Sequence, residues 1–360
     1  MERIRGFDGL RALAATSVVL THLGLLRWLG KSPLRTMVEG GPAVQLFFAL
    51  SGFLITALLV RERQAFGRVS VKYFYARRAC RIFPPYFVLL GAVAALHFAL
   101  AYVSKREGLV AAAVYLYNFQ PWRHWDPFLG HLWSLAVEEH FYLLWPVTFA
   151  VLYPRRKRAL VTGSLLVCLF AVLVQLRLPP WFARDYVPHR WTCFAGTSIL
   201  LGCVAAVLSC DTEYAPRWGP LLRSRGALLL AALLWANGFV VPAEMPLAYH
   251  LRGAGFALLV AWIYGNQGGR AARALEVAPL RYVGTISYGV YLYHGLFVTT
   301  GPERVAGHAW PPARWLGVLL LAVAAPVSYR FFESRFIRLG KRFRQREKVV
   351  VRERELVGAG

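Results

Sequence analysis

Long apolar segments alternate with short polar segments along almost the whole chain. A helix needs about 20 apolar residues to cross the hydrocarbon core of a bilayer, and ten segments approach or reach that length. We therefore predict an all-α fold, a polytopic transmembrane helical bundle of about ten helices. The predicted spans are 8–29, 42–60, 82–103, 131–153, 159–176, 191–208, 226–242, 253–266, 282–301 and 313–332.

The polar segments predict the orientation of the bundle, because Lys and Arg are enriched in cytoplasmic loops. Alternate loops together with the two ends contain 28 Lys and Arg residues, and the opposite loops contain 10. An even number of spans puts both termini on one side, so we expect both termini to be cytoplasmic. In this prediction residues 1–340 form the membrane domain and residues 341–360 a basic cytoplasmic tail.

Composition agrees with a membrane protein and narrows its partners. Hydrophobic residues make up 57% of the 360 positions, and the mean hydropathy is +0.45. A net charge of +24 would suggest nucleic acid in a soluble protein. Here the arginines lie in short loops between apolar segments, so we expect a lipid bilayer and no nucleic acid as partner. The five cysteines show neither a CxxC pair nor zinc spacing with His, so no metal site is expected.

The first apolar segment carries two residues that are costly inside a membrane, Arg11 and His22. Eleven residues are about three helical turns, so the two side chains share one helix face and are separated by about 16 Å. They either face a functional cavity or have ordinary structural roles. In the structural interpretation Arg11 reaches the membrane edge and His22 is a hydrogen-bonded residue of the bundle.

Three predicted spans carry ionisable residues at a similar depth. His22, Glu138 with Glu139, and His294 each lie about seven residues from the predicted outer ends of their spans. A His beside a carboxylate is the arrangement that general-base catalysis on a hydroxyl requires. Adjacent residues point about 100° apart on a helix, so we expect only one glutamate to face His22, and Glu138 is favoured. The alternative is that both glutamates are buried hydrogen-bonding anchors between helices.

The segment YARRACRIFPPYF, at the start of the third predicted span, adds a basic cluster. Arg78 and Arg81 are three residues apart, share a helix face and lie near the depth of Arg11. Three guanidinium groups at one mouth could bind phosphate groups in bidentate fashion. The alternative is that this loop is basic only because it is cytoplasmic, since Lys and Arg are enriched on that side of the membrane.

The second predicted span carries Ser51 and Gly52. Small residues permit close helix packing, and the other interpretation is that they form the wall of a ligand channel.

Six motifs in order resemble the acyltransferase-3 family of multi-pass membrane O-acyltransferases. They are DGLRALAATSVVLTH (8–22), FFALSGFLIT (47–56), RRACRIFPPY (77–86), WSLAVEEHFYLLWP (133–146), ISYGVYLYH (286–294) and SYRFFE (328–333). The resemblance implies a ten-helix bundle in a bacterial inner membrane that takes an acyl group, by default acetyl, from acyl-coenzyme A. The acceptor would be a hydroxyl of a carbohydrate, a glycolipid or a glycosylated metabolite, and no permanently bound cofactor is expected.

The resemblance also assigns residues. His22 with Glu138 or Glu139 would be catalytic, with His22 acting as general base or as transient acyl carrier. Arg11, Arg78 and Arg81 would bind the coenzyme. Apart from the resemblance, we predict that His294, Ser51 and Tyr288 bind the substrate. The rival hypothesis is a proton-coupled secondary transporter of an organic anion or a sugar derivative. A membrane scaffold without chemistry is a third possibility, which leaves the layer of ionisable residues unexplained.

Overall fold

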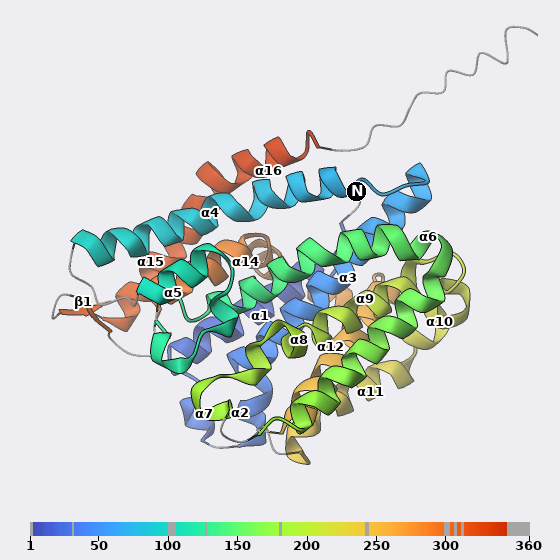
Figure 1. Cartoon of the computed structure of the whole chain (residues 1–360), viewed down its shortest axis with the longest axis horizontal. Helices are drawn as coiled ribbons and strands as arrows, with labels where there is room; N and C mark the ends of the chain where they lie inside the picture. Colours follow the sequence, from blue (N-terminus) through green and yellow to red (C-terminus); the bar gives the residue numbers. More distant parts are fainter. Residues whose placement is uncertain are drawn as a thin grey trace, which may run out of the picture.

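The structure, a computed structural model, is a helical bundle with one short hairpin (Figure 1). It describes residues 3–30, 32–99, 106–126, 128–179, 182–241, 245–298, 303–305, 308–310 and 313–343. The hairpin pairs β1 (Glu303–Val305) with β2 (His308–Trp310) in antiparallel register. The predicted tail, residues 341–360, lies outside the described residues from residue 344 onward.

The described residues form sixteen α-helices. They are α1 (Phe7–His22), α2 (Pro33–Val38), α3 (Gly40–Phe66), α4 (Val71–Ala99), α5 (Arg106–Ala113), α6 (Leu132–Leu176), α7 (Phe182–Asp185), α8 (Thr192–Ala195), α9 (Thr197–Cys210), α10 (Ala215–Leu222), α11 (Arg225–Trp235), α12 (Pro246–Gly265), α13 (Arg270–Ala274), α14 (Ala278–Phe297), α15 (Arg314–Val327) and α16 (Ser334–Gly340). Five 3₁₀ turns lie at Arg27–Leu29, Tyr117–Phe119, Trp122–His124, Pro188–Arg190 and Ala236–Phe239, and a π-helical turn, Ser328–Glu333, joins α15 to α16.

Six helices among the described residues are long and apolar enough to cross a membrane. They are Pro33–Phe66, Val71–Phe98, Leu132–Leu176, Thr192–Cys210, Pro246–Gly265 and Trp315–Gly340. The long helix α6 covers both the fourth and the fifth predicted span. Its backbone leaves helical geometry at Arg156 (φ −136°, ψ 45°), two residues after Pro154. Figure 1 shows the two arms of α6 folding back on each other at this kink.

The ends of several helices differ from the predicted spans, and two of these differences affect the site. The first span was expected to run to residue 29, but α1 ends at His22 because Gly24 adopts a positive φ of 72°. The third was expected to start at residue 82, but α4 starts at Val71 and carries the basic cluster inside the helix. The pattern of apolar residues predicted neither the end of α1 nor the start of α4. Apolar residues continue past His22, and the first turns of α4 contain charged residues.

Helix α3 is the centre of the bundle, with α1, α9 and α12 packed around it. Its approach to α9 is closest at two glycines. A Cβ atom on Gly52 would lie 2.0 Å from the carbonyl oxygen of Ile199, and one on Gly202 would lie 2.3 Å from that of Ala49. The packing interpretation of Gly52 is therefore confirmed, because no other residue fits at this crossing.

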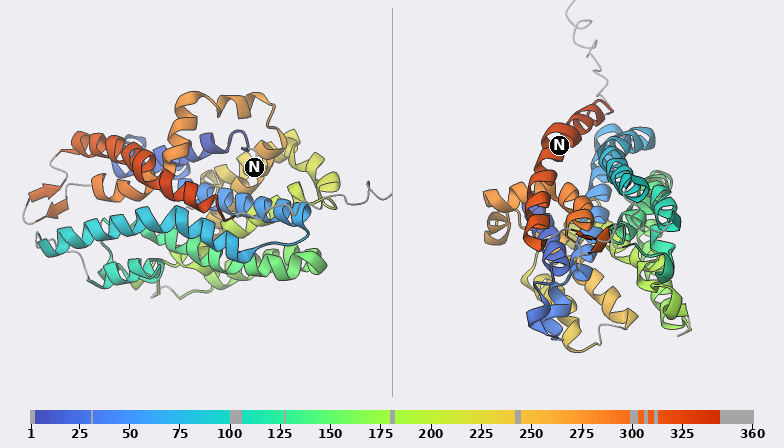
Figure 2. Two further views of the ribbon diagram at one scale, coloured as in Figure 1. Left: turned by 90° about the horizontal axis from the view of Figure 1, so that it is seen from above. Right: turned by 90° about the vertical axis from the view of Figure 1, so that its left-hand side faces the viewer.

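The outer helices keep an apolar surface. Large apolar side chains on both arms of α6 are exposed, among them Leu144, Val151, Leu166 and Phe170. The α15–α16 segment is exposed along most of its length and packs against α4, as the view from above shows (Figure 2). An apolar surface of this extent belongs in lipid, where the backbone hydrogen bonds are already satisfied within each helix.

Loops that were predicted to lie on the cytoplasmic side contact one another at one end of the bundle. Arg3 forms a salt bridge of 3.2 Å with Glu276, and Lys157 forms one of 2.9 Å with Asp211. This end carries the N-terminus, the α6 kink and α10, on the right of Figure 1.

The loops predicted for the other side meet at the opposite end. Arg252 donates from Nη1 to the carbonyl oxygen of Thr36 at 2.8 Å, and Asn118 donates to that of Arg190 at 3.4 Å. The loops thus alternate between two ends as the sequence predicted. The number of spans and the cytoplasmic position of the termini stay predictions.

Cysteine labelling tests that orientation. In a cysteine-free background, Arg68→Cys and Arg217→Cys mark the basic end, and Arg123→Cys marks the other. We expect a membrane-impermeant maleimide to label only Arg123→Cys on intact cells, and all three after permeabilisation. Labelling of Arg68→Cys from outside would reverse the assigned orientation.

Candidate active site

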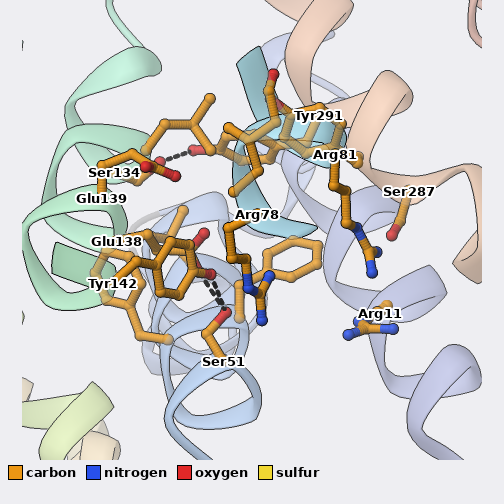
Figure 3. Close-up of a pocket in the computed structure, with 16 residues that line it drawn as sticks. Arg11, Ser51, Arg78, Arg81, Ser134, Glu138, Glu139, Tyr142, Ser287 and Tyr291 are labelled. Atoms are coloured by element: carbon orange, nitrogen blue, oxygen red, sulfur yellow. Dashed lines mark hydrogen bonds between the residues drawn. The ribbon is translucent and has the colours of Figure 1, made fainter. Parts of the chain in front are cut away.

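A cavity of about 90 Å³, called here the central cavity, lies between α1, α3, α4, α6 and α14. Its charged lining side chains are Arg11, Arg78, Arg81, Glu138 and Glu139. Figure 3 shows the three guanidinium groups gathered together on one side of this cavity. The structure thus brings all three arginines of the predicted coenzyme site together, although Arg11 is on a different helix from the other two.

Two of these arginines also line a second cavity. Arg78 and Arg81 face both the central cavity and a space of about 560 Å³ at the basic end of the bundle, called here the basic mouth. Arg61, Arg77 and Lys341 complete its positive lining. The (i, i+3) spacing in α4 puts Arg78 and Arg81 on one face, as predicted, so one pair of side chains serves both spaces.

Glu138 is held by a hydroxyl group and not by a histidine. Ser51 donates to Glu138 Oε1 at 2.5 Å, and the Tyr142 hydroxyl donates to Ser51 Oγ at 3.2 Å (Figure 3). The Tyr142 ring lies under the guanidinium of Arg78, with 4.5 Å between Cζ and the ring centroid. Glu138 is thereby fixed within the field of the arginines.

His22 lines a third cavity, of about 690 Å³, at the opposite end of the bundle. We call it the aromatic cavity, because Trp122, Trp125, Trp133 and Tyr249 contribute to its wall. No described residue forms a hydrogen bond with the His22 side chain. The imidazole of His22 is therefore open to whatever occupies this cavity.

Three imidazoles are in contact at this place. The ring centroids of His22 and His294 are 4.8 Å apart, and those of His131 and His294 are 4.6 Å apart. His294 donates from Nδ1 to the carbonyl of Tyr291 at 2.5 Å, and His131 donates from Nε2 to that of Leu292 at 2.9 Å. Those bonds fix both tautomers. They leave Nε2 of His294 and Nδ1 of His131 as buried lone pairs without a partner among the described residues.

The structure brings part of the predicted layer of ionisable residues together. His22 and His294 meet, whereas the described part of the chain shows no contact between His22 and Glu138, so their pairing stays a prediction. The cause is the early end of α1, which places His22 level with the start of α6. The residue at that level is His131, directly before α6, and Glu138 lies seven residues, or about 10 Å, farther along the chain.

The central and aromatic cavities adjoin at Tyr291, which lines both. Its hydroxyl is 2.5 Å from Ser134 Oγ and also donates to the carbonyl of His131 at 3.2 Å. Val44 lines both cavities as well. Through Arg78 and Arg81 at one side and Tyr291 at the other, the three cavities form a series that leads from the basic end to the aromatic end.

The remaining predicted residues lie in the central cavity. Ser51 lines it beside Glu138, which agrees with the channel-wall interpretation for Ser51 while Gly52 serves packing. Tyr288 lines it too and donates to the carbonyl of Ile82 at 3.0 Å. The sequence analysis missed His131 and Tyr291. Tyr291 resembles an ordinary bundle aromatic, and only its position within the motif at 286–294 could have indicated it. His131 lies just before its helix and outside the six motifs, so no sequence signal marked it.

Comparison with known proteins identifies the family of this chain. A sequence model of the acyltransferase-3 family, described as an acyltransferase domain, matches residues 4–331. The chain therefore belongs to the acyltransferase-3 family, and the predicted resemblance is confirmed.

Curated relatives are similar over most of this chain. They include the O-acetyltransferase OatA of Staphylococcus aureus, 27% identical over 91% of this chain and 56% of that protein. The peptidoglycan O-acetyltransferase OatA of Listeria monocytogenes is 26% identical, over 92% of this chain and 55% of its own length. The putative peptidoglycan O-acetyltransferase YrhL of Bacillus subtilis is 28% identical, over 92% and 54%.

This chain spans about half the length of those relatives. No solved structure matches it. Family membership and the apolar helices define the chain as an acyltransferase domain of a bacterial membrane protein.

A double-mutant cycle tests which side chain partners Glu138. We expect Ser51→Ala and Glu138→Gln to be coupled by about 1 kcal/mol in the free energy of unfolding, because Ser51→Ala removes the donor and Glu138→Gln replaces the carboxylate acceptor by a weaker amide acceptor. His22→Ala and Glu138→Gln should be additive within about 0.5 kcal/mol. Denaturant unfolding in detergent, followed by tryptophan fluorescence, gives these energies. Coupling of His22 with Glu138, and none with Ser51, would restore the original dyad.

Proposed function

We propose that the protein is a membrane O-acyltransferase that moves an acetyl group from acetyl-coenzyme A to a hydroxyl of a carbohydrate acceptor. The observation that carries the proposal is the series of three cavities, with a cluster of arginines at one end and an open imidazole at the other. We infer that the basic mouth opens to the cytoplasm, where acyl-coenzyme A is made, and that the membrane is the bacterial inner membrane.

The donor binds with its phosphate groups at the basic mouth. Arg78 and Arg81 suit phosphate because a guanidinium offers two parallel donors, and neither forms a salt bridge with a described carboxylate. The pantetheine arm then extends into the central cavity past Arg11. A cavity of about 90 Å³ accommodates the end of that arm with a short acyl group, since a single water already needs about 10–15 Å³ by this measure. This size favours acetyl over a long chain.

The acceptor binds in the aromatic cavity, with the reacting hydroxyl at His22. As general base, His22 takes the proton of the hydroxyl while the oxygen attacks the thioester carbonyl. The tetrahedral intermediate then expels the coenzyme A thiolate, and the proton on His22 passes to that sulfur. Contact with His294 keeps the His22 ring in place. Ser134 and Tyr291, where the cavities adjoin, lie on the route between thioester and hydroxyl.

His22 could instead accept the acetyl group as a transient acyl-imidazole. Incubation with radiolabelled acetyl-coenzyme A alone separates the two routes. Label that stays on the wild-type protein and is absent from His22→Ala supports the role of His22 as acyl carrier.

A carbohydrate acceptor is supported by the relatives, two of which are named as peptidoglycan O-acetyltransferases. The transporter hypothesis is not favoured, because the chain belongs to an acyltransferase family.

The role of His22 is tested by substitution. We expect His22→Ala to lower turnover by about 10²–10⁴-fold, the usual effect of removing an acid–base group, with the thermal unfolding temperature nearly unchanged. His97→Ala, on α4 and outside the three cavities, is the matched control and should keep full activity. Acetyl transfer per folded molecule is measured in detergent. Full activity of His22→Ala would end this proposal.

The donor site is tested with two donors. Arg78→Ala and Arg81→Ala should each raise KM for acetyl-coenzyme A by about 10–100-fold, the value of a charge-assisted hydrogen bond. Their KM for acetyl-pantetheine, which has no phosphate, should stay unchanged. Arg68→Ala, exposed on the neighbouring loop, is the control. Equal effects on both donors would show that the arginines do not bind phosphate.

A further inference from the structure

The aromatic cavity contains a second cationic site, far from the arginines of the central cavity. Arg190 lines it from the 3₁₀ turn that precedes α8, and its Nε and Nη1 atoms are buried without a hydrogen-bond partner among the described residues. Arg252, on α12, is only 6% exposed and lines the same cavity. It donates from Nη1 to the carbonyl of Thr36, and its Nε is likewise without a partner there.

No described carboxylate balances these two charges. The acidic side chain among the lining residues of the aromatic cavity is Glu39, and it forms a salt bridge of 2.5 Å with Arg35. Burial lowers the pKa of Arg190 to about 10, so its guanidinium is still positive at neutral pH. A buried guanidinium with unpaired nitrogens is costly in free energy unless a ligand supplies the counter-charge.

Three indole rings hold Arg190 in place. The Cζ atom lies 4.1 Å from the ring centroid of Trp125, 5.1 Å from that of Trp122 and 5.6 Å from that of Trp133. These rings stabilise the cation from its faces, so the nitrogens are free to donate in the guanidinium plane. Trp122 is 47% exposed, which leaves part of its ring open as an apolar surface for a ligand.

We propose that the aromatic cavity is a subsite for an acidic saccharide, whose carboxylate or phosphate is bound by Arg190 together with Arg252. The inference rests on the proposed function, because it places the reacting hydroxyl of that saccharide at His22 in the same cavity. The sugar ring lies against the exposed indole face, and the acid group forms the bidentate hydrogen bonds that a guanidinium offers. An acidic acceptor is selected because a neutral one would leave both guanidinium groups unpaired.

Binding is measured first, without any reaction. The protein is placed in nanodiscs of phosphatidylcholine, and quenching of tryptophan fluorescence is titrated with three sugars. N-acetylglucosamine is neutral, N-acetylmuramic acid adds a carboxylate, and N-acetylglucosamine 1-phosphate adds a phosphate. We expect at least one acidic sugar to bind about 10–100-fold more tightly than the neutral one. Equal affinity for all three would overturn the proposal, and the two acids identify which anion is held.

Substitutions of the two arginines test whether the preference for acidic sugars arises at this site. Arg190→Met should bring the acidic sugar to the affinity of the neutral one, and Arg190→Lys should restore part of the difference, since a charge returns without the planar fork. Arg177→Met, an exposed change outside this cavity near the end of α6, is the matched control and should bind like wild type. If Arg190→Met does not fold, Arg252→Met serves as the second variant. Retained preference for the acid in a folded variant of either arginine would remove that arginine from the proposed site.

The two proposals fail in different ways. If acidic sugars bind at Arg190 but acetyl transfer to them is absent in wild type, the subsite stands and the enzymatic proposal falls. If transfer occurs and is equally fast for the neutral and acidic sugars in wild type and in Arg190→Met, the enzymatic proposal stands and the subsite falls. Quenching by added phosphatidylglycerol that is lost in Arg190→Met would assign the site to a lipid headgroup and overturn the saccharide assignment.

Discussion

A charge inside a membrane protein must be matched by an opposite charge, by water or by a ligand, and the arrangement of this bundle depends on that constraint. Arg11, Arg78 and Arg81 come from two helices to one cavity, where Glu138 and Glu139 are the carboxylates in the lining. Of these, Glu138 is hydrogen-bonded to Ser51 and not to an arginine. Arg11 forms a salt bridge of 3.2 Å with Asp8, but Arg78 and Arg81 form none with a described carboxylate, so they retain donors for an incoming anion. Helix α3, at the centre of the bundle, supplies the serine that holds Glu138.

The same constraint explains why the arginines that would bind the proposed donor and the imidazoles that would face the proposed acceptor lie at different ends of the bundle. The positive charges at the basic mouth suit a phosphate-bearing donor, and the imidazoles at the other end are in contact with one another rather than with carboxylates. Tyr291 and Ser134 lie where the two cavities adjoin. Reacting groups that arrive from opposite ends would meet there, so neither substrate needs to cross the whole bundle.

The sequence predicted those features that depend on local spacing. Arg78 and Arg81 share a helix face because they are three residues apart, and Gly52 marks a close helix crossing because it has no side chain. The predicted pairing of His22 with Glu138 assumed that α1 continues past His22, but the positive φ of Gly24 ends the helix in the middle of a continuing apolar run. His131 could not be recognised, since a residue just before a helix has no periodic signal.

Sidedness of transfer in sealed proteoliposomes tests the central claim, that donor and acceptor enter from opposite ends, most directly. Acetyl-coenzyme A is supplied on one side only, and a hydroxyl acceptor is enclosed on the other side or mixed with the donor. For molecules whose basic end faces the donor, we expect acetylated product only when the acceptor is on the opposite side. Equal product with both substrates on the same side, in vesicles shown to be sealed, would contradict it.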